Sequence, residues 1–349
     1  MLFPALRPLL FMLDPERAHR LSIAGLKRAP SGQPPRHDPA LAVSLGGLTF
    51  PSPVGVAPGY DKDAEVPDAL LGLGFGFVEV GTITPLPQAG NPKPRLFRLT
   101  EDRAVINRMG FNNGGAEAAL ERLRARRGRP GVVGINIGAN KDSADRIADY
   151  AKMTELMAPL ASYLTVNISS PNTPGLRNLQ AGDALADLLA GVFEARARAQ
   201  GRGDGPPVFL KLAPDLEPRE IDAIAKVALD SPLAALIISN TTLARPPLRS
   251  KHAGESGGLS GAPLAPIALQ RLKDFRKATG GAIPLIAAGG IDSADAAWER
   301  IVAGASLVQL YSAMVYQGPM LGRRIARGLS QRLQREGFAS IEEAIGSQA

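Results

Sequence analysis

An eightfold alternation of short apolar segments and helix-patterned segments most constrains what this chain can fold into. Eight mostly apolar runs lie at residues 54–57, 77–81, 132–137, 163–168, 208–212, 235–239, 284–288 and 307–311. Segments with helical periodicity lie at residues 64–73, 115–126, 143–157, 183–200, 217–229, 263–279, 293–303 and 319–335. Runs that are apolar on both faces are typical of parallel strands covered by helices. Eight such units predict an α/β fold, a closed (β/α)8 TIM barrel, rather than an open sheet.

Two further strand-like stretches, at residues 95–99 and 104–106, lack helical periodicity. They lie within the second strand-to-helix connection and predict a hairpin inserted there.

The first forty residues do not follow the barrel pattern. Residues 1–13 are apolar but are interrupted by prolines and an arginine, and they are too short to cross about 30 Å of hydrocarbon. Asp14 and Pro15 predict the N-cap and first residue of a second helix, which is basic on one face. These helices predict either an element lying in a membrane interface or a cap on the barrel core. A proline-rich linker at 30–39 then separates an N-terminal element, residues 1–40, from a barrel domain, residues 41–349.

Composition limits the chemistry. Forty Lys and Arg against 33 Asp and Glu give a net charge of +7, which is compatible with an anionic substrate, a phosphate cofactor, nucleic acid or an anionic membrane. The chain has no cysteine, which excludes disulfides, thiolate nucleophiles and cysteine-ligated clusters. Its three histidines show no metal-ligand spacing, so we expect no metal site.

Polar residues at the ends of the strands predict one functional ring, because TIM barrels place their sites at the carboxyl ends of the strands. The central stretch is residues 163–177, where a β-branched strand ends in Asn167, Ser170 and Asn172. Lys211 interrupts an otherwise apolar strand. Amides, lysines and hydroxyls suit the binding of a planar polar molecule. Metal hydrolysis and glycoside cleavage instead need carboxylate or imidazole sets.

Two glycine clusters predict a phosphate site. Residues 257–261 hold three glycines before a helix, and Gly289 and Gly290 follow the seventh strand. Glycine turns leave backbone N–H groups accessible where barrels of this kind bind phosphate. A buried Lys211 also needs an anion nearby. Together these features predict a phosphorylated cofactor.

Seven segments, in order along the chain, resemble the dihydroorotate dehydrogenases of pyrimidine biosynthesis. They are residues 57–63, 107–112, 167–177, 211–215, 239–242, 258–261 and 288–292. Ser170 stands where the soluble classes carry cysteine, and a helical extension precedes the barrel. The resemblance is therefore to the membrane-associated, quinone-reducing class, class 2. It implies oxidation of (S)-dihydroorotate to orotate, with FMN as bound hydride acceptor and a membrane quinone as electron acceptor, in UMP biosynthesis.

The resemblance also implies roles by position. FMN would contact Pro58, Gly59, Tyr60, Asp61, Lys62, Thr82, Asn136, Asn167, Lys211, Ser239, Gly261, Gly290, Tyr311 and Ser312. Dihydroorotate would contact Lys62, Asn107, Arg108, Met109, Gly110, Phe111, Asn167, Asn172, Asn240 and Thr241. Ser170 would act as general base on C5 while hydride leaves C6, and Lys211 would stabilise the negative charge of the reduced flavin.

On the quinone side, His19 and Arg98 occupy positions that the family places near the quinone head. The resemblance implies a ubiquinone-type acceptor and peripheral membrane association through the N-terminal helices. Since no secretory leader is evident, we expect the cytoplasmic face of the bacterial inner membrane. We also expect a monomer and no nucleic-acid partner.

Alternatives stay open at this level. The chain could be a soluble family member using fumarate or NAD, a flavin-free barrel that isomerises a phosphorylated metabolite, or a membrane-surface scaffold with an inert barrel. Ser170 could simply end a strand, residues 107–111 could form only a turn, and residues 173–179 could be a lid or an irregular connection.

Overall fold

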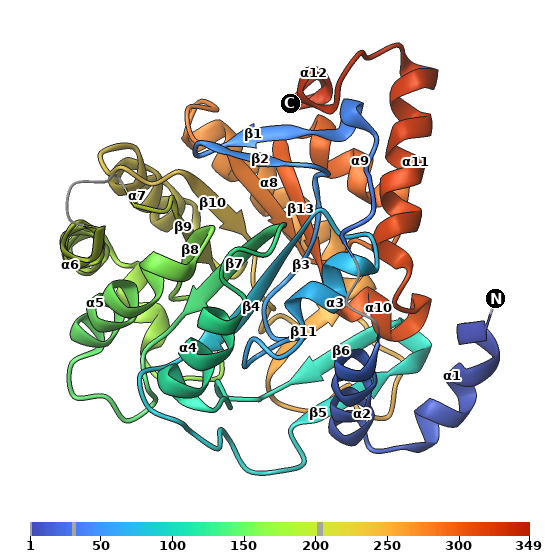
Figure 1. The fold of residues 1–349 in the computed structure, drawn as a ribbon, viewed down its shortest axis with the longest axis horizontal. Helices are drawn as coiled ribbons and strands as arrows, with labels where there is room; N and C mark the ends of the chain where they lie inside the picture. The colour runs from blue at the N-terminus through green and yellow to red at the C-terminus, as the bar shows by residue number, and fades with distance from the viewer. Residues whose placement is uncertain (1, 30–32, 201–204) are drawn as a thin grey trace.

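The computed structural model describes residues 2–29, 33–200 and 205–349, which form a closed parallel barrel surrounded by helices (Figure 1). The barrel order is β3, β4, β7, β8, β9, β10, β12 and β13. These strands are Val54–Val56, Phe77–Ile83, Val132–Ile137, Tyr163–Asn167, Val208–Leu212, Ala235–Ile238, Leu285–Ala288 and Ala305–Leu310. All eight predicted strands are confirmed, with ends that differ by at most two residues.

The outer helices follow the strands as predicted. They are α3 Pro67–Gly72, α4 Gly115–Ala125, α5 Arg146–Met157, α6 Gly182–Gln200, α7 Pro218–Leu229, α8 Ala265–Ala278, α9 Ala294–Val302 and α11 Leu321–Glu336. Apolar residues at helical spacing explain why these segments form helices that pack on the barrel. Helix α11, for example, buries Leu321, Ile325, Leu329 and Leu333, which are four residues apart. Helix α3 begins at Pro67 rather than at the predicted residue 64. The Asp61 carboxylate instead accepts hydrogen bonds from the N–H groups of Glu65 and Val66 and holds that stretch as a loop.

A hairpin that the sequence did not reveal closes the amino end of the barrel. Strands β1 Val43–Leu45 and β2 Leu48–Phe50 follow a short helix, η1 Pro39–Leu41. In Figure 1 the hairpin lies across the top of the barrel, beside α12 Ile341–Ala344. The Phe50 ring is buried, with its centroid 5.1 Å from that of Phe77 and 6.1 Å from that of Tyr163. The polar residues at the carboxyl ends of the strands therefore lie at the opposite end of the barrel from this hairpin.

A three-stranded antiparallel sheet covers part of the carboxyl end. The predicted inserted hairpin is confirmed as β5 Leu96–Leu99 and β6 Ala104–Asn107, which are joined by η2 Thr100–Asp102. Strand β11 Gly258–Gly261 pairs with β6, so the prediction of a glycine turn at 257–261 was wrong. Glycine is needed there for a different reason, because a Cβ atom on Gly258 would collide with Thr241.

The two N-terminal helices are confirmed as α1 Leu2–Met12 and α2 Pro15–Arg28, with Asp14 capping α2 by accepting from the N–H of Arg17 at 2.9 Å. They lie beside β5, β6 and helix α10, residues Ser312–Gln317, in Figure 1. Ile23 of α2 is buried in the core. Residues 30–32 of the predicted linker lie outside the described part of the chain, and residues 33–38 have no regular structure. Across residues 2–29, 33–200 and 205–349, no helix is long and apolar enough to cross a membrane.

Short helices shape several connections. Those near the carboxyl end are η4 Leu176–Gln180, η5 Ala262–Leu264 and α10 Ser312–Gln317, whereas η3 Ala158–Leu160 precedes β8 at the amino end. Tyr316 of α10 packs edge-on against Phe11 of α1 and donates a hydrogen bond to the carbonyl of Ala104 at 2.6 Å. Helix α10 therefore connects the end of the last barrel strand to the N-terminal helices.

Candidate active site

One cavity of about 620 Å³ lies between the carboxyl end of the barrel and the N-terminal helices. What we call its polar end is formed by Lys62, Asn107, Asn167, Ser170, Asn172, Lys211, Asn240 and Thr241. What we call its apolar end is formed by Leu10, Phe11, Ala18, Leu21, Leu26, Leu70, Leu73, Met314 and Pro319. The cavity therefore joins hydrogen-bonding groups from the barrel to an apolar wall built by α1 and α2 together with residues in or just after α3 and α10.

The structure brings most of the predicted site residues to this cavity. Those in its wall are His19, Pro58, Gly59, Tyr60, Lys62, Thr82, Arg98, Asn107, Met109, Gly110, Phe111, Asn167, Ser170, Asn172, Lys211, Ser239, Asn240, Thr241, Gly261, Gly290, Tyr311 and Ser312. Residues from both the barrel and the extension thus meet at one site.

Three predicted residues lie outside the described cavity wall. The buried Asp61 carboxylate anchors its own loop, and burial raises the pKa of Asp61 to about 6. Asn136 lies behind the wall, where its Oδ1 accepts hydrogen bonds from Thr82 at 2.5 Å and from Asn167 at 3.0 Å. The Arg108 guanidinium pairs with Glu255 at 2.7 Å. Direct ligand contact by these three side chains stays a prediction.

A buried polar cluster beneath the polar end was missed at the sequence level. The Glu79 carboxylate accepts hydrogen bonds from Asn136 at 2.7 Å, Tyr163 at 3.1 Å and Gln309 at 2.6 Å. Burial lowers the pKa of Lys211, and the charge of Glu79 opposes that shift. A protein carboxylate therefore supplies a negative charge near Lys211, which we had expected only from a bound phosphate. Glu79 interrupts an apolar strand just as Lys211 does, so the signal that singled out Lys211 could have found it.

Hydrogen bonds order the segment that carries Ser170. The Asn167 side chain donates to Thr82 Oγ1 at 3.0 Å and accepts from the Ser169 hydroxyl at 2.8 Å. Ser170 is nearly buried, and its Oγ accepts from the N–H of Asn172 at 3.2 Å. The side-chain amide of Asn172 in turn donates to Asn107 Oδ1 at 3.3 Å. Ser170 is thus held at the cavity wall with its own proton available for donation.

Lys62 is suited to binding an anion. Its Nζ donates to the carbonyl of Gly59 at 2.8 Å, and desolvation lowers its pKa to about 8. A bound carboxylate at this position would gain a charge-assisted hydrogen bond and would raise that pKa again.

His19 and Arg98 belong to the part of the wall built by the N-terminal helices. His19 Nε2 lies 2.8 Å from the carbonyl oxygen of Tyr60, and desolvation lowers the pKa of His19 to about 3, so the ring is neutral near pH 7. The Arg98 guanidinium donates to the carbonyls of Leu10 and Phe11, both at 3.1 Å, at the end of α1. Arg98 therefore anchors α1 as well as lining the cavity.

The fold and the site define a (β/α)8-barrel protein whose polar site meets an apolar wall partly formed by its N-terminal helices. Residues 40–333 match the family model of dihydroorotate dehydrogenase. The chain is 68% identical over 348 residues to the dihydroorotate dehydrogenase (quinone) of Erythrobacter litoralis, covering 100% of both chains. It is 66% identical over 351 residues to the enzyme of the same name from Novosphingobium aromaticivorans, covering 99% of both.

A solved structure, the Eimeria tenella DHODH in complex with ferulenol, superposes with a TM-score of 0.90 at 42% identity, covering 96% of this chain and 95% of that chain. The chain belongs to the dihydroorotate dehydrogenase family. The predicted family, the quinone-dependent class and the TIM barrel are confirmed.

Proposed function

We propose that this protein oxidises (S)-dihydroorotate to orotate in pyrimidine biosynthesis, with FMN as the bound hydride acceptor and a membrane quinone as the final electron acceptor. The observation that carries the proposal is that one cavity has both a polar and an apolar end, which suit a polar ring and a lipid-soluble acceptor respectively. The names of the relatives, dihydroorotate dehydrogenase (quinone), support the same reaction.

The residues present fit a flavin, and the family is flavin-dependent in general. The volume of about 620 Å³ is in the usual range for small-molecule sites. Lys211, Thr82 and Asn167 line its wall, and Gln309 Oε1 is buried there without a hydrogen-bond partner among the described residues. FMN would be held by these groups and, on its phosphate side, by Gly261, Gly290, Tyr311 and Ser312. When bound, FMN supplies the hydride acceptor.

The side chains of the polar end perform the remaining tasks. Lys62 binds the carboxylate of dihydroorotate, and the amides of Asn107, Asn172 and Asn240 pair with the ring amide groups. Ser170 Oγ takes the proton from C5 and passes its own hydroxyl proton on to water while the hydride leaves C6, so that the C5–C6 bond becomes double. Lys211 places a positive charge that would stabilise the negative charge of the reduced flavin.

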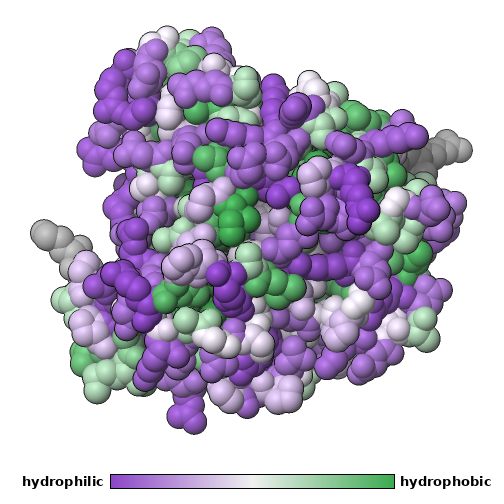
Figure 2. Space-filling model, turned by 180° about the vertical axis from the view of Figure 1, so that it is seen from behind, coloured by the Kyte–Doolittle hydropathy of each residue, from purple (hydrophilic) through white to green (hydrophobic). Residues whose placement is uncertain are grey.

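The N-terminal element, residues 1–40, forms the quinone side, with His19 and Arg98 near the quinone head, and a ubiquinone-type acceptor suits its apolar wall. Leu9, Met12 and Leu21 are 64%, 82% and 56% exposed, and such exposed apolar side chains on short helices suit a lipid interface. Figure 2 shows a mostly hydrophilic rear face with several green patches, one of which lies at the lower left near the N-terminus. We propose a monomer that associates peripherally with the cytoplasmic face of the inner membrane.

The test is the visible spectrum of the purified protein under anaerobic conditions. We expect a flavin spectrum that bleaches on addition of dihydroorotate and returns on addition of quinone but not of fumarate or NAD. Ser170→Ala is the matched variant and should keep the flavin but bleach at least about 100-fold more slowly. A protein that stays colourless after incubation with FMN would refute the proposal and favour the flavin-free barrel.

A further inference from the structure

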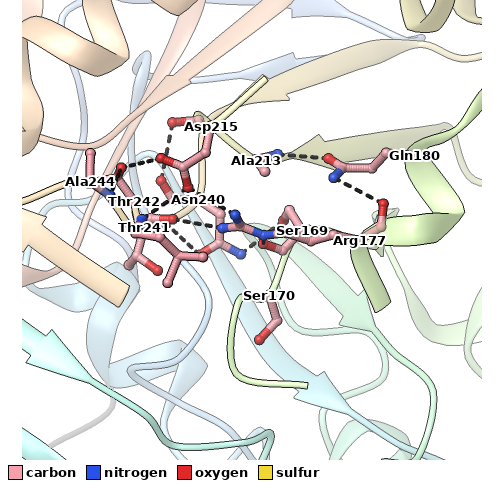
Figure 3. Close-up of polar contacts among 12 residues, drawn as sticks. Ser169, Ser170, Arg177, Gln180, Ala213, Asp215, Asn240, Thr241, Thr242 and Ala244 are labelled. Atoms are coloured by element: carbon pink, nitrogen blue, oxygen red, sulfur yellow. Dashed lines mark hydrogen bonds and ion pairs between the residues drawn. The ribbon is translucent and has the colours of Figure 1, made fainter. Parts of the chain in front are cut away.

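Arg177 joins three loops just outside the cavity. It lies on η4, and its Nε donates to the carbonyl of Ser169 at 3.1 Å. Its Nη1 donates to Asp215 at 2.9 Å in the loop after β9, and its Nη2 donates to the carbonyl of Thr241 at 3.2 Å in the loop after β10. Figure 3 shows the guanidinium between these groups. One side chain therefore sets the distances between the ends of three neighbouring strands.

Asp215 holds Arg177 in this orientation. One carboxylate oxygen of Asp215 accepts from the Thr242 hydroxyl, and the other accepts from the N–H of Leu243 at 3.0 Å as well as from Arg177. The Thr242 hydroxyl in turn accepts from the N–H of Ala244 at 2.9 Å. We call Arg177, Asp215 and Thr242 the clasp. None of the three is in the described cavity wall, so the clasp touches no ligand there.

The clasp acts on the peptide that precedes Ser170. Ser169 is held on its carbonyl by Arg177 and on its hydroxyl by Asn240, which donates at 2.9 Å. In Figure 3 the Ser170 side chain points away from this cluster. Asn240, Thr241 and Ser170 all line the cavity. The position of Ser170 relative to Asn240 and Thr241 thus depends on groups behind the wall.

We propose that Arg177, oriented by Asp215, is a positioning residue for the oxidation of dihydroorotate, an inference that rests on the role of Ser170 given above. The planar guanidinium presents donors in a fixed fork to three loops at once, whereas a lysine ammonium is a compact point charge on a flexible stem. It holds the Ser169–Ser170 peptide so that Ser170 Oγ meets C5 while Asn240 and Thr241 hold the ring. A misplacement of about 1 Å at such a contact can cost on the order of 100-fold in rate.

The experiment separates the two half-reactions of the flavin-loaded protein. Stopped-flow absorbance under anaerobic conditions gives the limiting rate and half-saturation for flavin reduction by dihydroorotate, and then the rate of reoxidation by a soluble quinone. The variants are Arg177→Met, Arg177→Lys and Asp215→Asn. Arg126→Met is the matched control, because Arg126 makes a similarly buried ion pair with Asp68 away from the cavity.

We expect Arg177→Met to lower the limiting rate of flavin reduction by about 10- to 100-fold, more than it changes half-saturation, and to leave reoxidation by quinone within about twofold. The limiting rates of flavin reduction in Arg177→Lys and Asp215→Asn should lie between those of Arg177→Met and the wild type. Arg126→Met should change neither half-reaction. If Arg177→Met fails to fold, Arg177→Lys and Asp215→Asn test the inference in the same way, by a slower flavin reduction with unchanged reoxidation.

The inference is overturned if flavin reduction stays within about twofold of wild type in the folded clasp variants, or if both half-reactions slow together. Ser170→Ala, measured alongside, separates this from failure of the proposed function. Slow reduction in Ser170→Ala with normal reduction in the clasp variants refutes the clasp alone. Normal reduction in Ser170→Ala refutes the role of Ser170, and the clasp inference with it.

Discussion

The ion pair between Glu16 and Arg95 should control electron transfer to quinone, because it docks α2 on the barrel. Arg95 Nε and Nη2 donate to the two Glu16 oxygens at 3.1 and 2.7 Å, and the two side chains are only 7% and 13% exposed. The pair is bidentate and nearly dry, unlike a surface ion pair. The change to make is Glu16→Ala.

The magnitude follows from what the change leaves behind. Removing one partner of a buried pair costs about 3–5 kcal/mol, because the other charge loses its compensation. Arg95 keeps two backbone acceptors, the carbonyls of Ala89 and Asn91, so the lower figure of about 3 kcal/mol applies. That cost would shift the equilibrium between docked and undocked α2 by about 100-fold towards the undocked state, since about 1.4 kcal/mol is a factor of ten.

The pH dependence of this docking follows from the pKa of Glu16. Its hydrogen bond with Arg95 holds that pKa below the ordinary 4.5. A carboxyl with a lowered pKa in the folded state contributes stability that is present above about pH 4.5 and is lost as the pH falls through the lowered value. The pair is therefore fully effective near pH 7.

The assay combines amide hydrogen exchange over residues 15–28 with the two half-reactions. We expect faster exchange in α2 and slower reoxidation by quinone, with flavin reduction by dihydroorotate within about twofold of wild type. Arg20→Ala is the control on the same helix, because Arg20 is 56% exposed and its pair with Glu65 should contribute under about 1 kcal/mol. Unchanged exchange and reoxidation in Glu16→Ala would refute the reasoning.

Three further outcomes are expected. Orotate should bind more weakly above about pH 8, approaching a tenfold loss per pH unit as Lys62 deprotonates, and a flat dissociation constant up to pH 9.5 in a spectral titration would contradict this. The double change Leu9→Asp with Met12→Asp should weaken binding to anionic vesicles by on the order of 100-fold in sedimentation, since burying each side chain is worth about 1.5–3 kcal/mol. Equal binding would argue against α1 as the membrane contact. Glu79→Leu should lower the free energy of unfolding by about 3 kcal/mol or more, because three buried donors lose their acceptor, and thermal unfolding matching wild type would show that account to be wrong.

Periodic features were predictable from the sequence because they depend on local spacing. The eight strands and the Asp14 cap of α2 were predicted near their observed bounds. Lys211 was found because a charge in an apolar strand must face something polar. Glu79 carries the same signal and was overlooked, while the hairpin at residues 43–50 has strands of only three residues and offers too short a pattern.

The sequence by itself determined the barrel, the end of the barrel that carries the polar groups and, through its motifs, the family. Tertiary structure alone decided which of those polar groups reach the cavity. Asp61 and Arg108 lie in the motifs and Asn136 lies in a predicted strand, yet the side chains of all three bond to partners behind or beside the wall, because neighbours distant in the chain determine their rotamers. The clasp has the same origin, since Arg177, Asp215 and Thr242 meet only when closure of the barrel brings adjacent strand ends together.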